Sequence, residues 1–159
     1  MVRRFAPFRS VVFLCYGNVC RSPFAAAVFD RLARQSPRIK ATVSSAGFVG
    51  PGRQSPPEAL AAGLRRSYKL DDHRSQLATP TLLRGADLIV VMSAEQARAA
   101  YLTGGAPRAP IVALGDFDPA PIDRRTILDP WGMSSSAFDQ SYDRIERCIR
   151  ELVAAIDPG

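Results

Sequence analysis

Two cysteines and an arginine lie close together in the segment CYGNVCRSP, which covers residues 15–23. Arg21 carries a planar guanidinium group whose N–H donors match two oxygens of a phosphate. A cysteine thiolate beside a bound phosphate is a nucleophile, so Cys15 and Arg21 together are typical of phosphoryl chemistry. The alternative is structural, because Cys15 could simply end a buried strand as a small apolar side chain, and a cysteine and an arginine six residues apart would alone favour that interpretation.

The other residues of the segment favour a phosphate-binding loop. The segment follows a short apolar run and precedes a helical pattern, so it is predicted to connect a strand to a helix, with Ser22 capping the helix and Pro23 at the first helical position. The N–H groups of such a loop and the N-terminal end of the helix attract anions. Gly17 allows the backbone to bend closely around the anion, and Asn18 tolerates left-handed geometry. These surroundings favour the thiolate form of Cys15.

The rest of the chain alternates apolar runs with helical patterns. The runs typical of buried parallel strands are residues 11–15, 41–45, 87–92 and 110–114. Amphipathic helical patterns cover residues 23–35 and 134–156, and the Pro- and Gly-rich segments 47–57 and 115–135 are predicted to be long loops. This alternation predicts an α/β fold with a mostly parallel sheet covered on both faces.

Composition narrows the class of protein. The chain has 159 residues, enough for one domain with a substantial core. Its formal net charge of +6 favours anionic partners, but no basic block is interleaved with aromatic residues, so no nucleic-acid partner is expected. No apolar stretch approaches the roughly 20 residues that span a bilayer, so no membrane insertion and a cytoplasmic location are expected. Three cysteines do not form an even-numbered disulfide framework, so reduced thiols are expected.

The segment CYGNVCRSP resembles the signature loop of the low-molecular-weight protein tyrosine phosphatases. Other segments resemble this family in the same order: SSAG at 44–47, ADLIVVM at 86–92, GDFDP at 115–119 and LDPWG at 128–132. The resemblance implies a single α/β domain of the flavodoxin-like, phosphatase I type, with a four-stranded parallel sheet and helices on both faces. It places this domain at residues 11–157, after a short N-terminal arm at residues 1–10, and it implies no metal and no cofactor.

The resemblance also implies a chemistry for individual residues. Cys15 matches the nucleophile that becomes phosphocysteine, Arg21 matches the clamp on the phosphate oxygens, and Asp129 matches the general acid that later activates water. The substrate would be a tyrosine-phosphorylated protein and the product inorganic phosphate. The substrate would contact Trp131 and the loop residues Tyr16, Gly17, Asn18, Val19, Cys20 and Ser22. Asn18, Ser22, Ser45 and His73 match a hydrogen-bonding network that supports the loop.

Several alternatives stay open at this stage. Protein arginine phosphatases resemble the chain closely, but they carry threonine at the position of Val19. Thioredoxin-coupled arsenate reductases have a similar loop but need a further pair of cysteines, and only Cys148 remains here. A non-catalytic phosphate-binding protein would need the loop without the nucleophile and the acid. The oligomeric state is not indicated.

The second thiol and the single histidine each have two interpretations. By resemblance, Cys20 forms a reversible redox pair with Cys15; the alternative is that it only packs beneath the loop. His73 could activate Cys15, but the resemblance assigns proton transfer to Asp129 and leaves His73 a bracing role. Cys15, Cys20 and His73 lack the spacing and the fourth ligand of a zinc site. Gln76 lies near a position where the family usually has an arginine.

Overall fold

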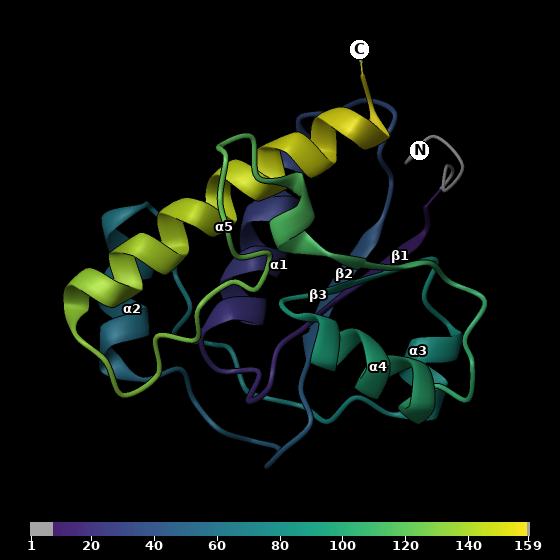
Figure 1. Ribbon diagram of the computed structural model, residues 1–159, viewed down its shortest axis with the longest axis horizontal. Helices are drawn as coiled ribbons and strands as arrows, with labels where there is room; N and C mark the ends of the chain where they lie inside the picture. Colours follow the sequence, from purple (N-terminus) through teal and green to yellow (C-terminus); the bar gives the residue numbers. More distant parts are fainter. Residues whose placement is uncertain (1–7, 159) are drawn as a thin grey trace.

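The computed structural model in Figure 1 describes residues 8–158. Its sheet contains four parallel strands in the order β2-β1-β3-β4. The strands are β1 (Ser10–Leu14), β2 (Thr42–Ala46), β3 (Leu88–Val91) and β4 (Ile111–Ala113). Each lies within one residue of, or inside, its predicted range. The prediction of a single α/β domain with a parallel sheet is therefore confirmed.

The central strands are buried on both faces, which explains their continuous apolar sequence. In β1, Val11 and Phe13 belong to one core cluster, whereas Val12 and Leu14 belong to the other. All four residues of β3 are buried as well. The edge strands β2 and β4 are less buried, in keeping with the polar residues of β2.

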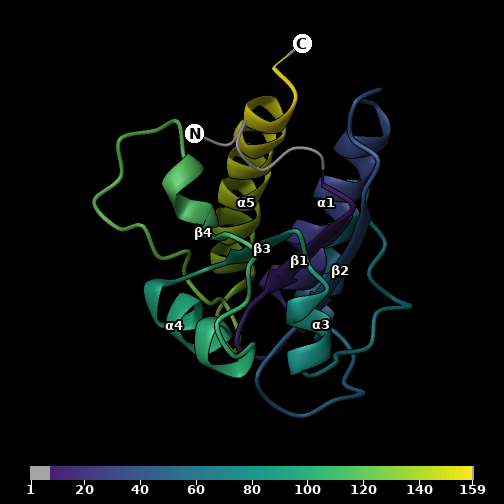
Figure 2. The ribbon, with the colours of Figure 1, turned by 90° about the vertical axis from the view of Figure 1, so that its right-hand side faces the viewer.

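Helices cover both faces of the sheet (Figure 2). One face carries α1 (Arg21–Arg34) and α5 (Ser135–Ile156), with α2 (Pro57–Arg65) packed against α5. The other face carries α3 (Pro80–Arg84) and α4 (Ala94–Thr103). A short 3-10 helix, η2 (Leu114–Phe117), follows β4. No helix within residues 8–158 has the length and apolarity required to cross a bilayer.

Three of these helices have no counterpart among the predicted elements. The helices α2, α3 and α4 span nine, five and ten residues, which is too short for a convincing apolar period. Side-chain caps help to define two of them, since Thr79 accepts a hydrogen bond from Leu82 N and Ser93 accepts one from Gln96 N. The loop predicted for 47–57 ends where α2 begins, at Pro57.

The predicted N-terminal arm at residues 1–10 is only partly within the described chain. Residues 1–7 lie outside the described residues. Phe8 is buried in the core, and Ser10 already pairs with Thr42 of β2. The sheet therefore begins one residue before the predicted domain boundary at residue 11.

The order of the strands determines where a site can form. The chain passes from β1 to β2 on one side and then to β3 on the other side of β1. Loops leaving the carboxyl ends of β1 and β3 therefore diverge, and the crevice between them is the usual ligand site of an open parallel sheet. The segment that begins with Cys15 leaves β1 at this point.

Candidate active site

The loop after β1 places the Cys15 thiol among hydrogen-bonding groups. Asn18 N donates to Cys15 Sγ at 3.2 Å, and Ser22 Oγ lies 3.0 Å from the same sulfur. These two contacts hold the sulfur in place at the beginning of the loop. Cys15 itself is 2% exposed, so solvent reaches this sulfur only through the pocket described below.

The start of α1 differs from the prediction. The helix begins at Arg21 rather than at Pro23, its N-cap residue is Cys20, and no side chain caps it. The prediction that Ser22 caps the helix is therefore wrong. The hydroxyl of Ser22 contacts Cys15 Sγ instead and accepts a hydrogen bond from Asn18 Nδ2 at 2.8 Å. Ser22 Oγ therefore contacts the Cys15 thiol and does not cap the helix.

Asn18 is the centre of the network that holds the loop. Its backbone is left-handed, with φ of 53°, as the sequence predicted from its tolerance of this geometry. Its side chain is completely buried and donates to Ser22 Oγ at 2.8 Å and to Ser45 Oγ at 2.9 Å. The side-chain oxygen accepts from Gln76 N at 2.9 Å. One side chain thus connects the loop to β2 and to the segment around residue 76.

His73 lies behind the loop. Its Nε2 is 2.6 Å from Asn18 O, and since a carbonyl can only accept, this nitrogen carries the hydrogen. Burial lowers the pKa of His73 below its ordinary value; the bond to Asn18 O opposes this shift and the nearby Arg74 adds to it. A neutral His73 that braces the loop fits this position. Within residues 8–158, no cluster of three or more His, Cys, Asp or Glu side chains is arranged to bind a metal.

Gln76 and Gly47 complete the support, and the sequence analysis assigned neither a role. Gln76 Nε2 donates to Ser45 O at 2.9 Å, so the residue near the usual arginine position makes its own contact with β2. A Cβ at Gly47 would lie 2.8 Å from both Asn18 N and Tyr16 O. Only glycine therefore allows the end of β2 to approach the loop this closely.

Helix α5 supports the loop from below. Tyr142 is fully buried and its hydroxyl donates to Cys20 O at 2.7 Å. The ring of Tyr142 stacks on Phe24 of α1, with ring centroids 3.9 Å apart and planes 3° from parallel. Tyr142 lies within the amphipathic pattern at 134–156, but that pattern does not reveal the hydrogen bond to the loop.

Arg21 and Asp129 meet across the crevice although they are far apart in the sequence. Arg21 is 4% exposed; its Nη1 donates to Ile127 O at 2.9 Å, and its Nη2 lies 3.4 Å from Asp129 Oδ2. Arg21 Nε is buried and has no hydrogen-bond partner among the described residues. The Asp129 side chain is 44% exposed, and its other oxygen accepts from Trp131 N at 3.2 Å. The carboxyl group is thus held beside the guanidinium at the mouth of the pocket.

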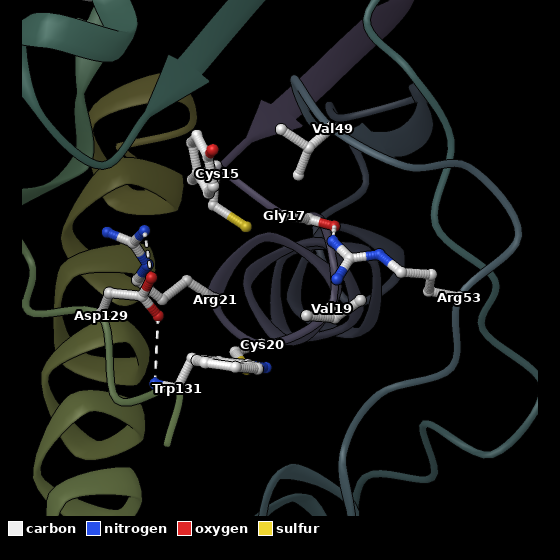
Figure 3. A pocket seen from close by; sticks show the side chains of 10 residues that line it. Cys15, Gly17, Val19, Cys20, Arg21, Val49, Arg53, Asp129 and Trp131 are labelled. Carbon is white, nitrogen blue, oxygen red and sulfur yellow. Dashed lines mark hydrogen bonds and ion pairs between the residues drawn. The ribbon is translucent and has the colours of Figure 1, made fainter. Parts of the chain in front are cut away.

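These residues surround a cavity of about 250 Å³. Figure 3 shows the Cys15 sulfur pointing into it, with Arg21 and Asp129 on one side, Val19 and Arg53 on the other, and Trp131 along a third side. Trp131 is 62% exposed, so one face of its ring is available to a ligand. The residues that line the cavity are Cys15, Tyr16, Gly17, Val19, Cys20, Arg21, Val49, Arg53, Asp129 and Trp131.

Two of these lining residues, Val49 and Arg53, are not among the residues predicted from the sequence. Arg53 Nη2 donates to Gly17 O at 3.0 Å, and its Nε donates to Gly50 O at 3.2 Å. A Cβ at Gly17 would lie 2.9 Å from the same guanidinium, so Gly17 makes room for Arg53. Both missed residues lie in a Pro- and Gly-rich loop without periodicity, and nothing local in the sequence indicates that the loop folds over the thiol.

The two remaining cysteines are buried thiols. Burial, together with the negative charges of Asp129 and Cys15, raises the pKa of Cys20 far above its ordinary value. Burial likewise raises the pKa of Cys148 on α5 to about 12. Both groups are therefore protonated at neutral pH. Cys20 lines the pocket, whereas Cys148 does not.

The parallel sheet and the loop that holds Cys15 and Arg21 opposite Asp129 point to a class of phosphatase, and comparison with known proteins identifies the family. Residues 10–158 match the family described as low molecular weight phosphotyrosine protein phosphatase. The chain belongs to this family, whose members are cysteine-dependent hydrolases.

Individual relatives are similar over nearly their whole length. The low molecular weight protein-tyrosine-phosphatase Wzb of Salmonella typhi is 32% identical, with 94% of this chain and 95% of that protein covered. The protein-arginine-phosphatase of Bacillus subtilis is 30% identical, with 89% and 93% covered. The crystal structure of the tyrosine phosphatase Wzb from Escherichia coli K30 in complex with sulphate superposes with a TM-score of 0.81, at 27% identity and with 96% and 99% of the two chains covered.

Proposed function

We propose that this protein hydrolyses phosphotyrosine in proteins through a phosphocysteine intermediate, without metal or cofactor. The observation that carries the proposal is that Cys15 Sγ, the Arg21 guanidinium and the Asp129 carboxyl group all face one pocket. A nucleophile, a bidentate cation and a proton donor are the groups that such a displacement needs. The nucleophilic thiol must stay reduced, which supports a cytoplasmic location.

In the first step, the phosphate group enters the loop between Cys15 and Arg21. The unpartnered Nε of Arg21 can then donate to a phosphate oxygen, which would give this buried N–H its acceptor. Cys15 Sγ attacks phosphorus while the bond from phosphorus to the tyrosine oxygen breaks. Protonated Asp129 gives its proton to that oxygen, so neutral tyrosine leaves and phosphocysteine remains.

In the second step, the roles of the groups reverse. The Asp129 carboxylate takes a proton from a water molecule, and the oxygen of that water attacks the phosphorus of phosphocysteine. The bond between sulfur and phosphorus breaks, which restores the Cys15 thiolate and releases inorganic phosphate. The Asn18 N–H and the Ser22 hydroxyl, both already in contact with Sγ, stabilise the thiolate as the leaving group.

The walls of the pocket favour an aromatic phosphate ester. Trp131 offers a largely exposed ring face, and Val19 and Val49 add apolar surface opposite it. A phenyl ring can pack in this slot while its phosphate reaches Cys15. Val19 is also the position where, by resemblance, arginine phosphatases carry threonine. The similarity to a protein-arginine-phosphatase nevertheless makes phosphoarginine the second substrate to test.

The test compares one peptide sequence carrying phosphotyrosine, phosphoserine or phosphoarginine, together with thioredoxin-coupled arsenate reduction. We expect kcat/KM to be highest for phosphotyrosine. Cys15→Ser should abolish turnover and still bind the phosphate analogue tungstate, whereas Asp129→Asn should lower kcat/KM by about 10²–10⁴. A preference for phosphoarginine would overturn the proposed substrate, and turnover by Cys15→Ser above about 1% of the parent would overturn the proposed nucleophile.

A further inference from the structure

The segment that leads to Asp129 has no regular secondary structure of its own. Between η2 and α5, residues 118–134 form neither helix nor strand, and most of residues 119–126 are exposed. Within the segment, Asp129 accepts a hydrogen bond from Trp131 N, but no regular structure fixes the backbone that leads up to Asp129. The contacts that do fix it come from other elements, chiefly from α5.

Helix α5 binds alternate carbonyl groups of this segment. Arg144 Nη2 donates to Arg124 O at 2.6 Å, and Arg144 Nη1 donates to Thr126 O at 2.7 Å. One turn earlier on the same helix, Ser141 Oγ donates to Leu128 O at 3.1 Å. A single guanidinium group thus holds two carbonyls, and a hydroxyl holds the third, immediately before Asp129.

A buried carboxylate fixes the orientation of Arg144. Asp118 Oδ2 lies 2.9 Å from Arg144 Nε, and the Asp118 side chain is only 3% exposed. Burial alone would raise the pKa of Asp118, but hydrogen bonds from Arg147, Ala120 N and Arg144 outweigh it and lower the pKa to about 2. Asp118 is therefore charged at every pH at which the protein would be assayed. The Arg144 side chain is 11% exposed, so the pair is largely shielded from solvent.

Residues 124–128, which α5 holds, are also bonded directly to Arg21, the proposed clamp on the phosphate. Ile127, which lies between two of the bound carbonyl residues, is fully buried and donates from its N–H to Met92 O at 3.0 Å. Its carbonyl accepts from Arg21 Nη1 at 2.9 Å. A displacement of this segment would therefore move Asp129 relative to Arg21 and to any phosphate bound beside it.

We propose that Arg144 is a positioning residue for the proton transfer: it holds residues 124–128 against α5 so that Asp129 faces the leaving oxygen of the substrate. This inference rests on the proposed function, because it assigns Arg144 a part in the step performed by Asp129. Arg144 does not line the catalytic pocket, so it acts only through the loop. Misplacement of a catalytic group by about 1 Å can cost about 10²-fold in rate, which sets the size of the expected effect.

The neighbouring Arg147 provides a matched control. It binds the same carboxylate, with Nε and Nη2 at 2.9 and 3.1 Å from the two Asp118 oxygens. Among the described residues, however, Arg147 donates to Asp118 alone, whereas Arg144 also binds the loop carbonyls. Arg144→Met and Arg147→Met therefore remove the same charge from the same helix, and only the first releases the loop.

The experiment measures kcat/KM for phenyl phosphate and 4-nitrophenyl phosphate in the parent, Arg144→Met, Arg147→Met and Asp129→Asn. This parameter reports the phosphorylation step, and phenolate needs a proton far more than 4-nitrophenolate does. We expect Arg144→Met to lower kcat/KM for phenyl phosphate by about 10- to 100-fold and that for 4-nitrophenyl phosphate by less than about threefold. Arg147→Met should keep the parent ratio of the two substrates. Inhibition by inorganic phosphate should be unchanged in Arg147→Met, because Arg147 does not line the pocket and, among the described residues, donates to Asp118 alone.

If Arg144→Met does not fold, Arg144→Lys replaces it. The lysine keeps the charge facing Asp118, but one ammonium group cannot bind the carboxylate and both carbonyls together, so the same selective loss is expected. Equal losses for both substrates, or equal ratios in the Arg144 and Arg147 variants, would overturn the inference. If the loss in kcat/KM of Asp129→Asn does not depend on the leaving group, then the proposed general acid is wrong. If Asp129→Asn shows this dependence and the Arg144 variants do not, then only the positioning role is wrong.

Discussion

Replacement of Asn18 by alanine should strongly destabilise the loop that follows β1. The substitution removes the side-chain bonds to Ser22 Oγ, Ser45 Oγ and Gln76 N. It also forces an alanine into the left-handed backbone geometry, at φ of 53°. The two effects act on the same residue but have different physical origins, so they can be separated.

The contacts of Asn18 set the size of the effect. Each of the three hydrogen bonds contributes about 0.5–1.5 kcal/mol to stability. Left-handed geometry costs an alanine about 1–2 kcal/mol more. We therefore expect Asn18→Ala to lower the free energy of unfolding by about 2.5–6.5 kcal/mol, which is a large part of the 5–15 kcal/mol typical of such a domain. Activity should fall as well, because Ser22 loses a contact that fixes it against Cys15.

Urea unfolding followed by circular dichroism measures the difference in free energy of unfolding between the variant and the parent. Two controls separate the contribution of the hydrogen bonds from that of the backbone geometry. Ser45→Ala removes one bond of the network and should cost about 1–2 kcal/mol. Asn18→Gly removes all three bonds but accepts left-handed geometry, so it should be more stable than Asn18→Ala by about 0.5–1 kcal/mol. If the free energy of unfolding of Asn18→Ala lies within about 1 kcal/mol of that of the parent, then the network does not hold the loop. If the glycine variant is the less stable of the two, then left-handed geometry at residue 18 does not strain an alanine.

Three further predictions concern the groups around the pocket. Because the pKa of His73 is lowered in the fold, the unfolded chain binds more protons than the folded protein as pH falls below about 6.5, so the contribution of His73 to stability is complete above that pH and declines below it. His73→Gln can still donate to Asn18 O and should remove this part of the pH dependence of urea unfolding. Identical pH profiles for the parent and this variant would contradict the assignment. After peroxide treatment, dithiothreitol should restore more activity to the parent than to Cys20→Ser, because Cys20 can trap a sulfenic acid on Cys15 as a disulfide with release of water. Since burial raises the pKa of Cys20, the fraction of activity recovered by the parent should increase with the pH of the treatment. Equal recovery of the two proteins without a crosslinked peptide would leave Cys20 a packing role. Arg53→Met should raise KM for 4-nitrophenyl phosphate severalfold with little change in kcat. The difference in KM between this variant and the parent should shrink in about 1 M salt, where charges are screened beyond about 3 Å. A difference in KM that does not depend on salt would exclude an electrostatic role for Arg53.

The sequence by itself determined the local features of this protein. The short apolar runs predicted all four strands, and those of β1 and β3 are apolar throughout because these central strands are buried on both faces. The amphipathic pattern predicted α5 almost to the residue, and the types of residue between Cys15 and Arg21 indicated an anion-binding loop. Family resemblance then pointed to Asp129, which no local pattern distinguishes from an ordinary turn residue. Each of these inferences depends on residues that are neighbours in the chain or on a motif matched as a unit.

The tertiary structure alone decided how distant segments meet. Arg21 contacts Ile127 and Asp129 only because the loops after β1 and β4 end at the same edge of the sheet. Arg53 reaches Gly17 from a loop without any periodic signal, and the carbonyls that Arg144 binds carry no side-chain signature in the sequence. A hydrogen bond to a backbone group depends on where that backbone lies, not on which residue supplies it. The backbone contacts that hold the walls of the pocket are therefore visible only after the chain has folded.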